Sequence, residues 1–226
     1  CSWLVYRNAN HIWVTSLEIA SFVRDTYGIS KTAMTICPNW IEVEKFRPRI
    51  PASKRTPRIL FVGRFAYQKN IPMLFEALSN SNIEVLLVGN GNQLPGLLDL
   101  AGKLNVNAKF IGQIPNEKMP DIYNDAAVCV LCSGYEGNPK VLLEAMSCGC
   151  AVIGTNVPGI RELIRHQENG LLVDLTSDSL REGIDHLLVN PMLRDRLGRQ
   201  AREDILESNS LSEYAQKEAD VYRQLC

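Results

Sequence analysis

The sequence predicts an α/β fold in which a parallel β-sheet is covered by helices on both faces. Short apolar runs alternate with segments of helical periodicity through most of the chain, and this order is typical of parallel sheets. The runs are apolar at nearly every position, as expected for strands that are buried on both faces. Crossover connections would then place the loops that follow the strands at one edge of the sheet.

Six apolar runs predict the strands of this sheet. They comprise residues 59–62, 85–88, 109–111, 128–131, 151–154 and 171–173. Between these runs the helical pattern restarts near Ile71, Gln93, Lys118, Pro139 and Gly159. Because parallel sheets bind ligands at the carboxyl ends of their strands, loops that are distant in sequence can converge on one site.

The two ends of the chain add further elements. Residues 12–16 predict a strand that leads directly into a helix. After the last strand of the sheet, two apolar stripes predict two helices, the second capped by Asn190 and Pro191. Ser210 and Glu213 have the spacing of a capping box and predict a last, amphipathic helix.

The composition is that of an ordinary globular protein. The 226 residues are 46% hydrophobic and 22% charged, with a net charge of −1. This balance does not suggest a nucleic-acid partner, and no run approaches the ~18 consecutive apolar residues of a membrane-spanning helix. The chain begins with Cys1 rather than Met, within a patterned segment, so we expect a fragment of a longer protein.

Four of the seven cysteines have a spacing that invites comparison with zinc sites. Cys129 and Cys132 form a C-x2-C pair, and Cys148 and Cys150 form a C-x-C pair. The first pair lies on an apolar strand, where residues three apart face opposite sides of the sheet. We therefore expect reduced, buried thiols and no metal site. The histidines have no catalytic context and are expected to be structural or exposed; they are His11, His166 and His186.

The most informative feature is a pair of glutamates, Glu136 and Glu144, separated by a Gly137-Asn138-Pro139 turn. Asn138 is a good N-cap and Pro139 a good first helical residue, so we expect a helix to begin at about Pro139. Its first N–H groups lack partners within the helix and, with the helix dipole, form a site for an anion. Glu144 lies inside this helix and must find a hydroxyl or a cation if it is buried. Taken alone, the pattern also fits a capped surface helix with two solvated acids.

A second group of candidate residues follows the first strand of the sheet. Gly63 begins a turn that carries Arg64 and Lys69 away from the end of that strand. Two cations at this position suit a diphosphate, since arginine binds its oxygens bidentately and lysine supplies a point charge. Each cation taken singly also fits a solvated basic loop. A further glycine turn at residues 89–91 matches neither the dinucleotide fingerprint nor the Walker A pattern.

Taken in order, these motifs resemble the C-terminal, donor-binding domain of retaining glycosyltransferases of the GT-B fold, family 4, also called group 1. The resemblance covers nearly the whole chain and implies a Rossmann-like sheet, the C-terminal half of a GT-B fold. It is carried by a hinge segment, the first strand with its glycine turn, a base-binding loop, the E-x7-E spacing and two later segments. These are residues 36–48, 59–70, 110–115, 136–144, 149–164 and 169–173.

The resemblance implies roles for the residues around the sugar and the nucleoside. Glu136 would lie against the donor sugar, with the backbone of the Gly137-Asn138-Pro139 turn alongside. Glu144 would accept hydrogen bonds from the ribose hydroxyls. Ile114 belongs to the loop whose backbone would hold the base.

The resemblance also implies roles around the diphosphate. Arg64 and Lys69, next to Gly63, would neutralise the departing nucleoside diphosphate and would act with Glu136 as the catalytic group. Val141 would donate its N–H to a phosphate. Lys140 places an extra cation on the first helical turn, and it is either a phosphate contact or a solvated lysine.

The implied activity is metal-independent, retaining transfer of a hexose from a nucleoside-diphosphate sugar, such as GDP-mannose or a UDP-hexose. The acceptor would be a saccharide or lipid-linked, as in polysaccharide biosynthesis. The sequence contains no D-x-D for a metal, so the cations of the protein would replace Mg²⁺ and no cofactor is expected. The alternatives are a nucleotide-sugar binding module without transfer activity and another enzyme of the same fold, such as a sugar-nucleotide epimerase or a phosphorylase.

The expected organisation has three parts. Residues 1–48 would be the end of an N-terminal acceptor domain and the interdomain hinge. Residues 49–208 would form the donor-binding domain, and residues 209–226 an amphipathic helix that packs back toward the N-terminal part. Because most of the acceptor domain would be missing, we expect this stretch to be inactive alone. The resemblance implies a cytoplasmic enzyme that could associate peripherally with a membrane through the missing domain.

Overall fold

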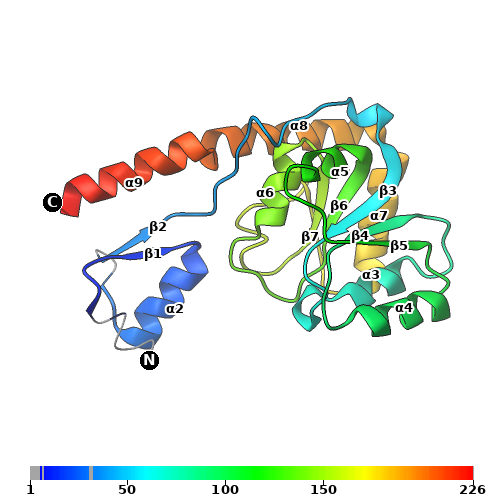
Figure 1. The fold of residues 1–226 in the computed structure, drawn as a ribbon, viewed down its shortest axis with the longest axis horizontal. Helices are drawn as coiled ribbons and strands as arrows, with labels where there is room; N and C mark the ends of the chain where they lie inside the picture. Colours follow the sequence, from blue (N-terminus) through cyan, green and yellow to red (C-terminus); the bar gives the residue numbers. More distant parts are fainter. Residues whose placement is uncertain (1–5, 7, 31–32, 226) are drawn as a thin grey trace.

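Figure 1 shows a computed structural model of the chain, which describes residues 6, 8–30 and 33–225. Its main body is a six-stranded parallel sheet with the strand order β5-β4-β3-β6-β7-β8. The predicted fold class and all six predicted strands are confirmed, although β3 and β6 begin earlier than expected. The strands are β3 (Thr56–Val62), β4 (Val85–Val88), β5 (Ala108–Gly112), β6 (Ala126–Leu131), β7 (Ala151–Thr155) and β8 (Leu171–Val173).

Helices cover both faces of this sheet, and each face has its own apolar core (Figure 1). One core is formed with α3 (Ile71–Ala77), α4 (Leu94–Lys103) and α7 (Ser177–Val189). The other is formed with α5 (Met119–Asp125), α6 (Lys140–Ser147) and α8 (Pro191–Ser208). The strands are buried between the two layers, which explains why their sequences are continuously apolar.

The order of the strands reverses at the centre of the sheet. β3 pairs with β4 on one side and with β6 on the other, so the chain leaves β3 toward β5 and then returns. The loops that follow β3 and β6 therefore emerge side by side and diverge over opposite faces. Ligands of open α/β sheets bind in the crevice at such a point.

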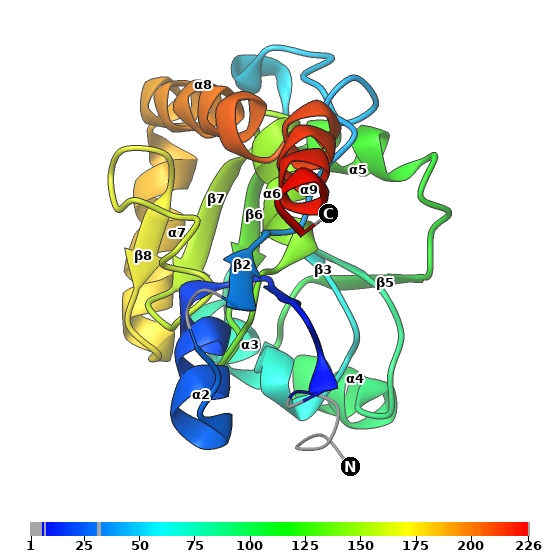
Figure 2. The same cartoon turned by 90° about the vertical axis from the view of Figure 1, so that its left-hand side faces the viewer.

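A small unit precedes the main sheet. β1 (Ile12–Val14) and β2 (Met34–Ile36) form a parallel pair, and α2 (Leu17–Tyr27) connects them in sequence. The strand followed directly by a helix is what residues 12–16 predict. The last helix, α9 (Leu211–Leu225), extends from the end of α8 toward this unit (Figures 1 and 2). A ring contact links the two parts, with the Trp13 and Tyr222 centroids 6.3 Å apart, and Trp40, which follows β2 in the hinge segment, lies 6.1 Å from Tyr214 of α9 by ring centroids.

Two of the predicted caps are present at the C-terminal helices. Asn190 Oδ1 accepts the N–H of Leu193 at 3.0 Å, and Ser210 Oγ accepts the N–H of Glu213 at 3.3 Å. Each bond satisfies one of the donors that a helix start leaves open. No helix within residues 6, 8–30 and 33–225 combines the length and apolar character needed to cross a membrane.

The helix predicted from Gly159 is wrong, because residues 158–163 form turns instead. Gly159 has a φ of +76°, and a Cβ at this position would lie 2.3 Å from the carbonyl oxygen of Glu136. The apolar spacing that resembled a helix reflects the burial of Ile160 and Ile164 beneath the turn. Tertiary packing therefore overrides the local helical pattern.

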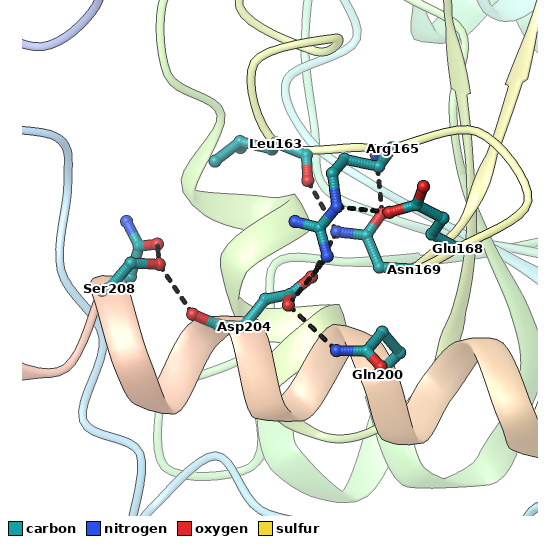
Figure 3. Close-up of polar contacts among 8 residues, drawn as sticks. Leu163, Arg165, Glu168, Asn169, Gln200, Asp204 and Ser208 are labelled. Carbon is teal, nitrogen blue, oxygen red and sulfur yellow. Dashed lines mark hydrogen bonds and ion pairs between the residues drawn. The ribbon is translucent and has the colours of Figure 1, made fainter.

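A polar network fixes this turn region to α8 (Figure 3). Arg165 donates to Asp204 Oδ1 at 3.0 Å, and Asn169 Nδ2 donates to Asp204 Oδ2 at 2.6 Å. Gln200 adds a bond to the same carboxylate at 3.2 Å. Asn169 Oδ1 also accepts the N–H of Arg165 at 2.7 Å, so the loop is closed on itself as well as on the helix.

Two glycines provide a matched test of this packing. A Cβ on Gly198 of α8 would lie 2.3 Å from the carbonyl oxygen of Gly149, whereas a Cβ on the exposed Gly96 of α4 would meet nothing within 4 Å. We predict that Gly198→Ala lowers the free energy of unfolding by about 1–3 kcal/mol through overpacking. Gly96→Ala should raise it by about 0.4–1 kcal/mol, because the unfolded chain loses conformational freedom. Urea unfolding measures both, and equal effects would contradict the close approach of α8.

Candidate functional site

The loops after β3 and β6 are joined to one another where the strand order reverses. The carbonyl oxygen of Gln68 accepts the N–H of Gly134 at 2.9 Å, and Gln68 Nε2 donates to the carbonyl oxygen of Tyr135 at 2.9 Å. Gln68 lies in η3 (Tyr67–Lys69), the short 3-10 helix that follows the glycine turn of β3. These two hydrogen bonds fix the positions of the two loops relative to each other.

An ion pair connects the charged residues of the same loops. Lys69 Nζ donates to Glu136 Oε1 at 2.5 Å, and Ser133 Oγ donates to the same oxygen at 2.6 Å. The exposed fractions of the Lys69 and Glu136 side chains are 17% and 8%. Glu136 Oε2 receives no hydrogen bond from a described residue, and therefore it can accept one from a ligand.

A cavity of about 390 Å³ opens at the carboxyl ends of β3 and β4, and neither Lys69 nor Glu136 is among the residues that line it. Four of the predicted residues line it, namely Gly63, Arg64, Ile114 and Glu144. Arg64 is exposed and forms no ion pair within the described chain. The remaining lining residues are mostly apolar or carry amides: Val62, Val88, Gly89, Asn90, Gln113, Asn116 and Met119.

Glu144 reaches the cavity from inside α6, where it is only 8% exposed. The fully buried Tyr123 of α5 donates its hydroxyl to Glu144 Oε2 at 2.7 Å. The sequence predicts a hydroxyl or cation partner for this carboxylate, and the structure confirms a hydroxyl. Glu144 Oε1 has no partner among the described residues, so it is available to a ligand in the cavity.

The electrostatics of this carboxyl reflect its burial. Burial raises the pKa of Glu144, and the Tyr123 hydrogen bond and the nearby Lys140 and Lys45 act in the opposite direction without cancelling it. Burial also raises the pKa of Tyr123 well above its ordinary value, and the charge of Glu144 raises it further. Tyr123 therefore remains a protonated donor to Glu144.

The N-terminus of α6 differs from the prediction in one respect. The helix begins at Lys140 with Pro139 as its N-cap, and Asn138 does not cap it. The side chain of Asn138 instead accepts the N–H of Asn39 at 2.8 Å. The N–H groups of Lys140 and Val141 donate to no described residue, which leaves them open at the positive end of the helix dipole.

Lys140 extends away from the large cavity. Its Nζ lies 5.1 Å from the ring centroid of Trp40, within reach of a cation–π interaction. With Lys45 it lines a second cavity of about 210 Å³, which shares Asn116 with the larger one. Both alternatives for Lys140, a phosphate contact and a solvated lysine, remain predictions.

The second glycine turn is explained by close packing. A Cβ on Gly89 would lie 1.9 Å from the carbonyl oxygen of Gly63, and one on Gly91 would lie 2.3 Å from that of Phe65. The backbone at residues 89–91 therefore packs directly on the glycine turn of β3. This turn supports the site and contributes Gly89 and Asn90 to the cavity.

The described cysteines are buried, free thiols. Cys129 and Cys132 belong to the apolar cores on opposite faces of the sheet, as the strand spacing predicts. Burial raises the pKa of Cys132 and of Cys148 to about 12, so both are protonated at neutral pH. Cys1 and Cys226 lie outside the described residues. Within the described ranges, no three His, Cys, Asp or Glu side chains are grouped to hold a metal.

The three histidines are structural or exposed, as predicted. His11 Nε2 and Thr35 Oγ1 are 2.8 Å apart, and His166 Nδ1 accepts the N–H of Leu172 at 3.0 Å. His186 is exposed on α7.

Several residues of the site carry no sequence signal. Tyr123 and Ser133 support the two glutamates, and Gln113 and Asn116 supply amides to the cavity. None of them belongs to a motif that the residues alone identify. Only the need of Glu144 for a partner anticipated one of these contacts.

A family model described as glycosyl transferases group 1 matches residues 42–204, which is most of the chain. The chain belongs to the group 1 glycosyltransferases. It is 33% identical over 203 residues to an uncharacterized glycosyltransferase of Methanocaldococcus jannaschii, covering 87% of the chain and 52% of that relative. It is 31% identical over 176 residues to a phosphatidyl-myo-inositol mannosyltransferase of Mycobacterium tuberculosis, covering 70% of the chain and 46% of the relative. The chain thus spans about half the length of the curated relatives it matches.

Solved structures share the fold of this group 1 chain. A sucrose-phosphate synthase from Thermosynechococcus elongatus superposes with a TM-score of 0.89 at 28% identity, covering 99% of the chain and 60% of that structure. HepE of Anabaena, solved in complex with UDP-glucose, gives a TM-score of 0.88 at 19% identity, covering 98% of the chain and 65% of that structure. At this low identity the second likeness concerns the fold alone.

The raised pKa of Glu144 predicts a pH-dependent cost to stability. A carboxyl that binds its proton more tightly in the folded state destabilises that state increasingly as pH rises. This change spans the window from the ordinary glutamate pKa of about 4.3 to the raised pKa of Glu144. Glu144→Gln keeps an acceptor for Tyr123 and removes this cost. Its stability relative to the parent should therefore increase across the window and then level off.

Urea unfolding between about pH 4 and pH 8 measures this difference. Glu207→Gln, which removes an exposed glutamate of α8, is the matched control for the loss of one charge. A stability difference for Glu144→Gln that stays constant with pH would show that burial does not govern this carboxyl.

Proposed function

We propose that this chain is the donor-binding half of a retaining glycosyltransferase that transfers a hexose from a nucleoside-diphosphate sugar without a metal ion. The observation that carries the proposal is the cavity lined by Glu144 and by Arg64, whose loop also carries Lys69 of the Lys69–Glu136 ion pair. It lies where the strand order reverses, in a chain of the group 1 family.

The large cavity is suited to a nucleoside. The unpartnered Oε1 of Glu144 can accept hydrogen bonds from the two ribose hydroxyls, which are donors close together on one face of the sugar. Ile114 offers an apolar surface to the base, and the amides of Gln113 and Asn116 offer donors and acceptors to its edge. The UDP bound to HepE of Anabaena supports a nucleoside diphosphate as the ligand class.

The diphosphate would lie between the α6 N-terminus and the loop after β3. The free N–H groups of Lys140 and Val141, together with the helix dipole, favour an anion there. Arg64 is exposed at the cavity and can bind phosphate oxygens bidentately. Lys69, which is paired with Glu136, lies in the same loop as Arg64 and adds a second positive charge.

These groups would assist transfer because negative charge on the leaving diphosphate grows in the transition state. A fixed donor aimed at such a charge contributes roughly 2.7–4 kcal/mol, and only interactions that strengthen in the transition state accelerate the reaction. The free Oε2 of Glu136 would bind a sugar hydroxyl and hold the donor against these groups. In this proposal Arg64 and Lys69 supply the positive charge that Mg²⁺ supplies elsewhere.

The acceptor would bind to the N-terminal half of the whole protein. The relatives' names support both acceptor classes, because they include a phosphatidyl-myo-inositol mannosyltransferase and a glycogen synthase. A lipid-linked acceptor would place the enzyme at a membrane surface, and we propose a cytoplasmic location for it. The chain alone should bind the donor and transfer no sugar.

The test is calorimetric titration of the chain with UDP, GDP and ADP, with the matching nucleosides and with 2′-deoxy forms. Arg64→Ala should weaken diphosphate binding about tenfold or more and nucleoside binding little, because a hydrogen bond to a charged group contributes roughly 1.5–3 kcal/mol. Glu144→Gln should weaken ribonucleotides more than deoxynucleotides.

Arg196→Ala is the control, since it removes an exposed arginine of α8 that is outside the cavity. Equal losses for diphosphate and nucleoside in Arg64→Ala would overturn its assignment. A parent chain that binds none of the three diphosphates would overturn the proposed function.

A further inference from the structure

The hinge segment is bonded directly to the turn between the two glutamates. The backbone N–H of Asn39 donates to Asn138 Oδ1 at 2.8 Å, and Asn39 Nδ2 donates to the carbonyl oxygen of Asn138 at 2.6 Å. This reciprocal pair joins residues that are 99 positions apart in sequence. Both bonds are at or below the usual length for an N–H donor, so the pairing is close.

Asn39 is itself held from the other side. Its carbonyl oxygen accepts Asn209 Nδ2 at 3.0 Å, and the N–H of Ile41 donates to the carbonyl oxygen of Asn209 at 2.9 Å. Ile41 and Asn209 are buried, at 1% and 7% exposed, in the corner between α8 and α9. Asn39 is therefore a fixed point against which Asn138 is positioned.

The bond to Asn39 replaces the contact that Asn138 would ordinarily make. An asparagine just before Pro139 is a favourable N-cap, and its Oδ1 would then accept the N–H of the residue two or three positions later. Those residues are Lys140 and Val141, whose N–H groups are open in the structure. Because Asn138 Oδ1 accepts the N–H of Asn39 instead, the N-terminus of α6 keeps these two donors free.

We propose that Asn39 is a positioning residue: it holds the Asn138 carboxamide away from the N-terminus of α6 and so keeps the donor's phosphate site open. The inference rests on the proposed function, since it concerns the same anion site. Lys140 and Trp40 add a second contact between the hinge and this helix, with Nζ 5.1 Å from the ring centroid.

Without the Asn39 side chain, the Asn138 carboxamide would block the free N–H groups at the start of α6. Asn39→Ala keeps the backbone N–H that Asn138 Oδ1 accepts, but it removes the 2.6 Å bond that anchors the Asn138 backbone, so the Asn138 carboxamide can leave the hinge and cap α6. A capped helix has fewer free donors for phosphate, and ligand binding must first break the cap. Removing the Asn138 carboxamide as well abolishes the cap and restores access to the same N–H groups.

The test is a double-mutant cycle on the chain, read as the dissociation constant of whichever of UDP, GDP and ADP the parent binds most tightly. Asn39→Ala should weaken binding about two- to tenfold, the range expected for one neutral hydrogen bond. Asn39→Ala with Asn138→Ala should recover most of the lost affinity, and Asn138→Ala alone completes the cycle. A merely structural role for Asn39 predicts no recovery.

Asn190→Ala is the control for stability, because it removes another half-buried asparagine with a side-chain hydrogen bond to the backbone, in this case to the N–H of Leu193 in α8. It should lower the melting temperature and leave the dissociation constant unchanged. Unchanged binding in Asn39→Ala, or an equal loss in the single and double variants, overturns the inference while the parent still binds the nucleotide. A parent that binds none of the three diphosphates instead overturns the proposed function.

Discussion

The ion pair between Lys69 and Glu136 depends on a constraint of the sheet, which is the reversal of strand order between β3 and β6. This reversal brings together two loops that have β4, β5 and β6 between them in sequence. Both side chains are largely buried, so each charge needs the other: removing one partner of a buried pair costs about 3–5 kcal/mol, because the remaining charge stays desolvated. The backbone bonds of Gln68 to the second loop maintain the same geometry without charge. The sugar end of the proposed site is therefore shaped by contacts within the protein itself.

The nucleoside end follows a different principle, because it keeps a carboxylate in a place that disfavours its charge. Burial raises the pKa of Glu144, and the hydroxyl of Tyr123, together with the nearby Lys140 and Lys45, compensates only in part. Such a cost is expected where a protein retains a polar group for binding rather than for stability. A ribose would donate hydrogen bonds to Glu144 Oε1, which receives none from the described residues. The second glycine turn supports this arrangement, because its backbone approaches the first turn too closely for any side chain.

Local patterns were sufficient to predict the sheet, and they failed where distant residues decide the structure. The six apolar runs are strands because continuous burial on two faces leaves few other arrangements. Gly159 begins no helix because the backbone of Glu136 packs against it, and Asn138 caps no helix because Asn39 competes for its side chain. Neither competitor is near in sequence, so no periodicity could reveal it. The same holds for Tyr123, whose role depends on the packing of α5 beside α6. Both wrong predictions, the helix at Gly159 and the cap at Asn138, involve residues 136–139 of the proposed site. Functional sites are where local preferences are most often overridden.

The central claim is that the cavity and the α6 N-terminus bind one nucleoside diphosphate between them. A crystal structure of the chain with UDP or GDP tests this claim most directly. The account predicts the ribose hydroxyls on the Glu144 carboxylate and the diphosphate between Arg64 and the free N–H groups of Lys140 and Val141. Asn138 should remain bonded to the hinge. A nucleotide bound elsewhere on the chain, or bound in the cavity with its phosphates directed away from α6, would contradict the account.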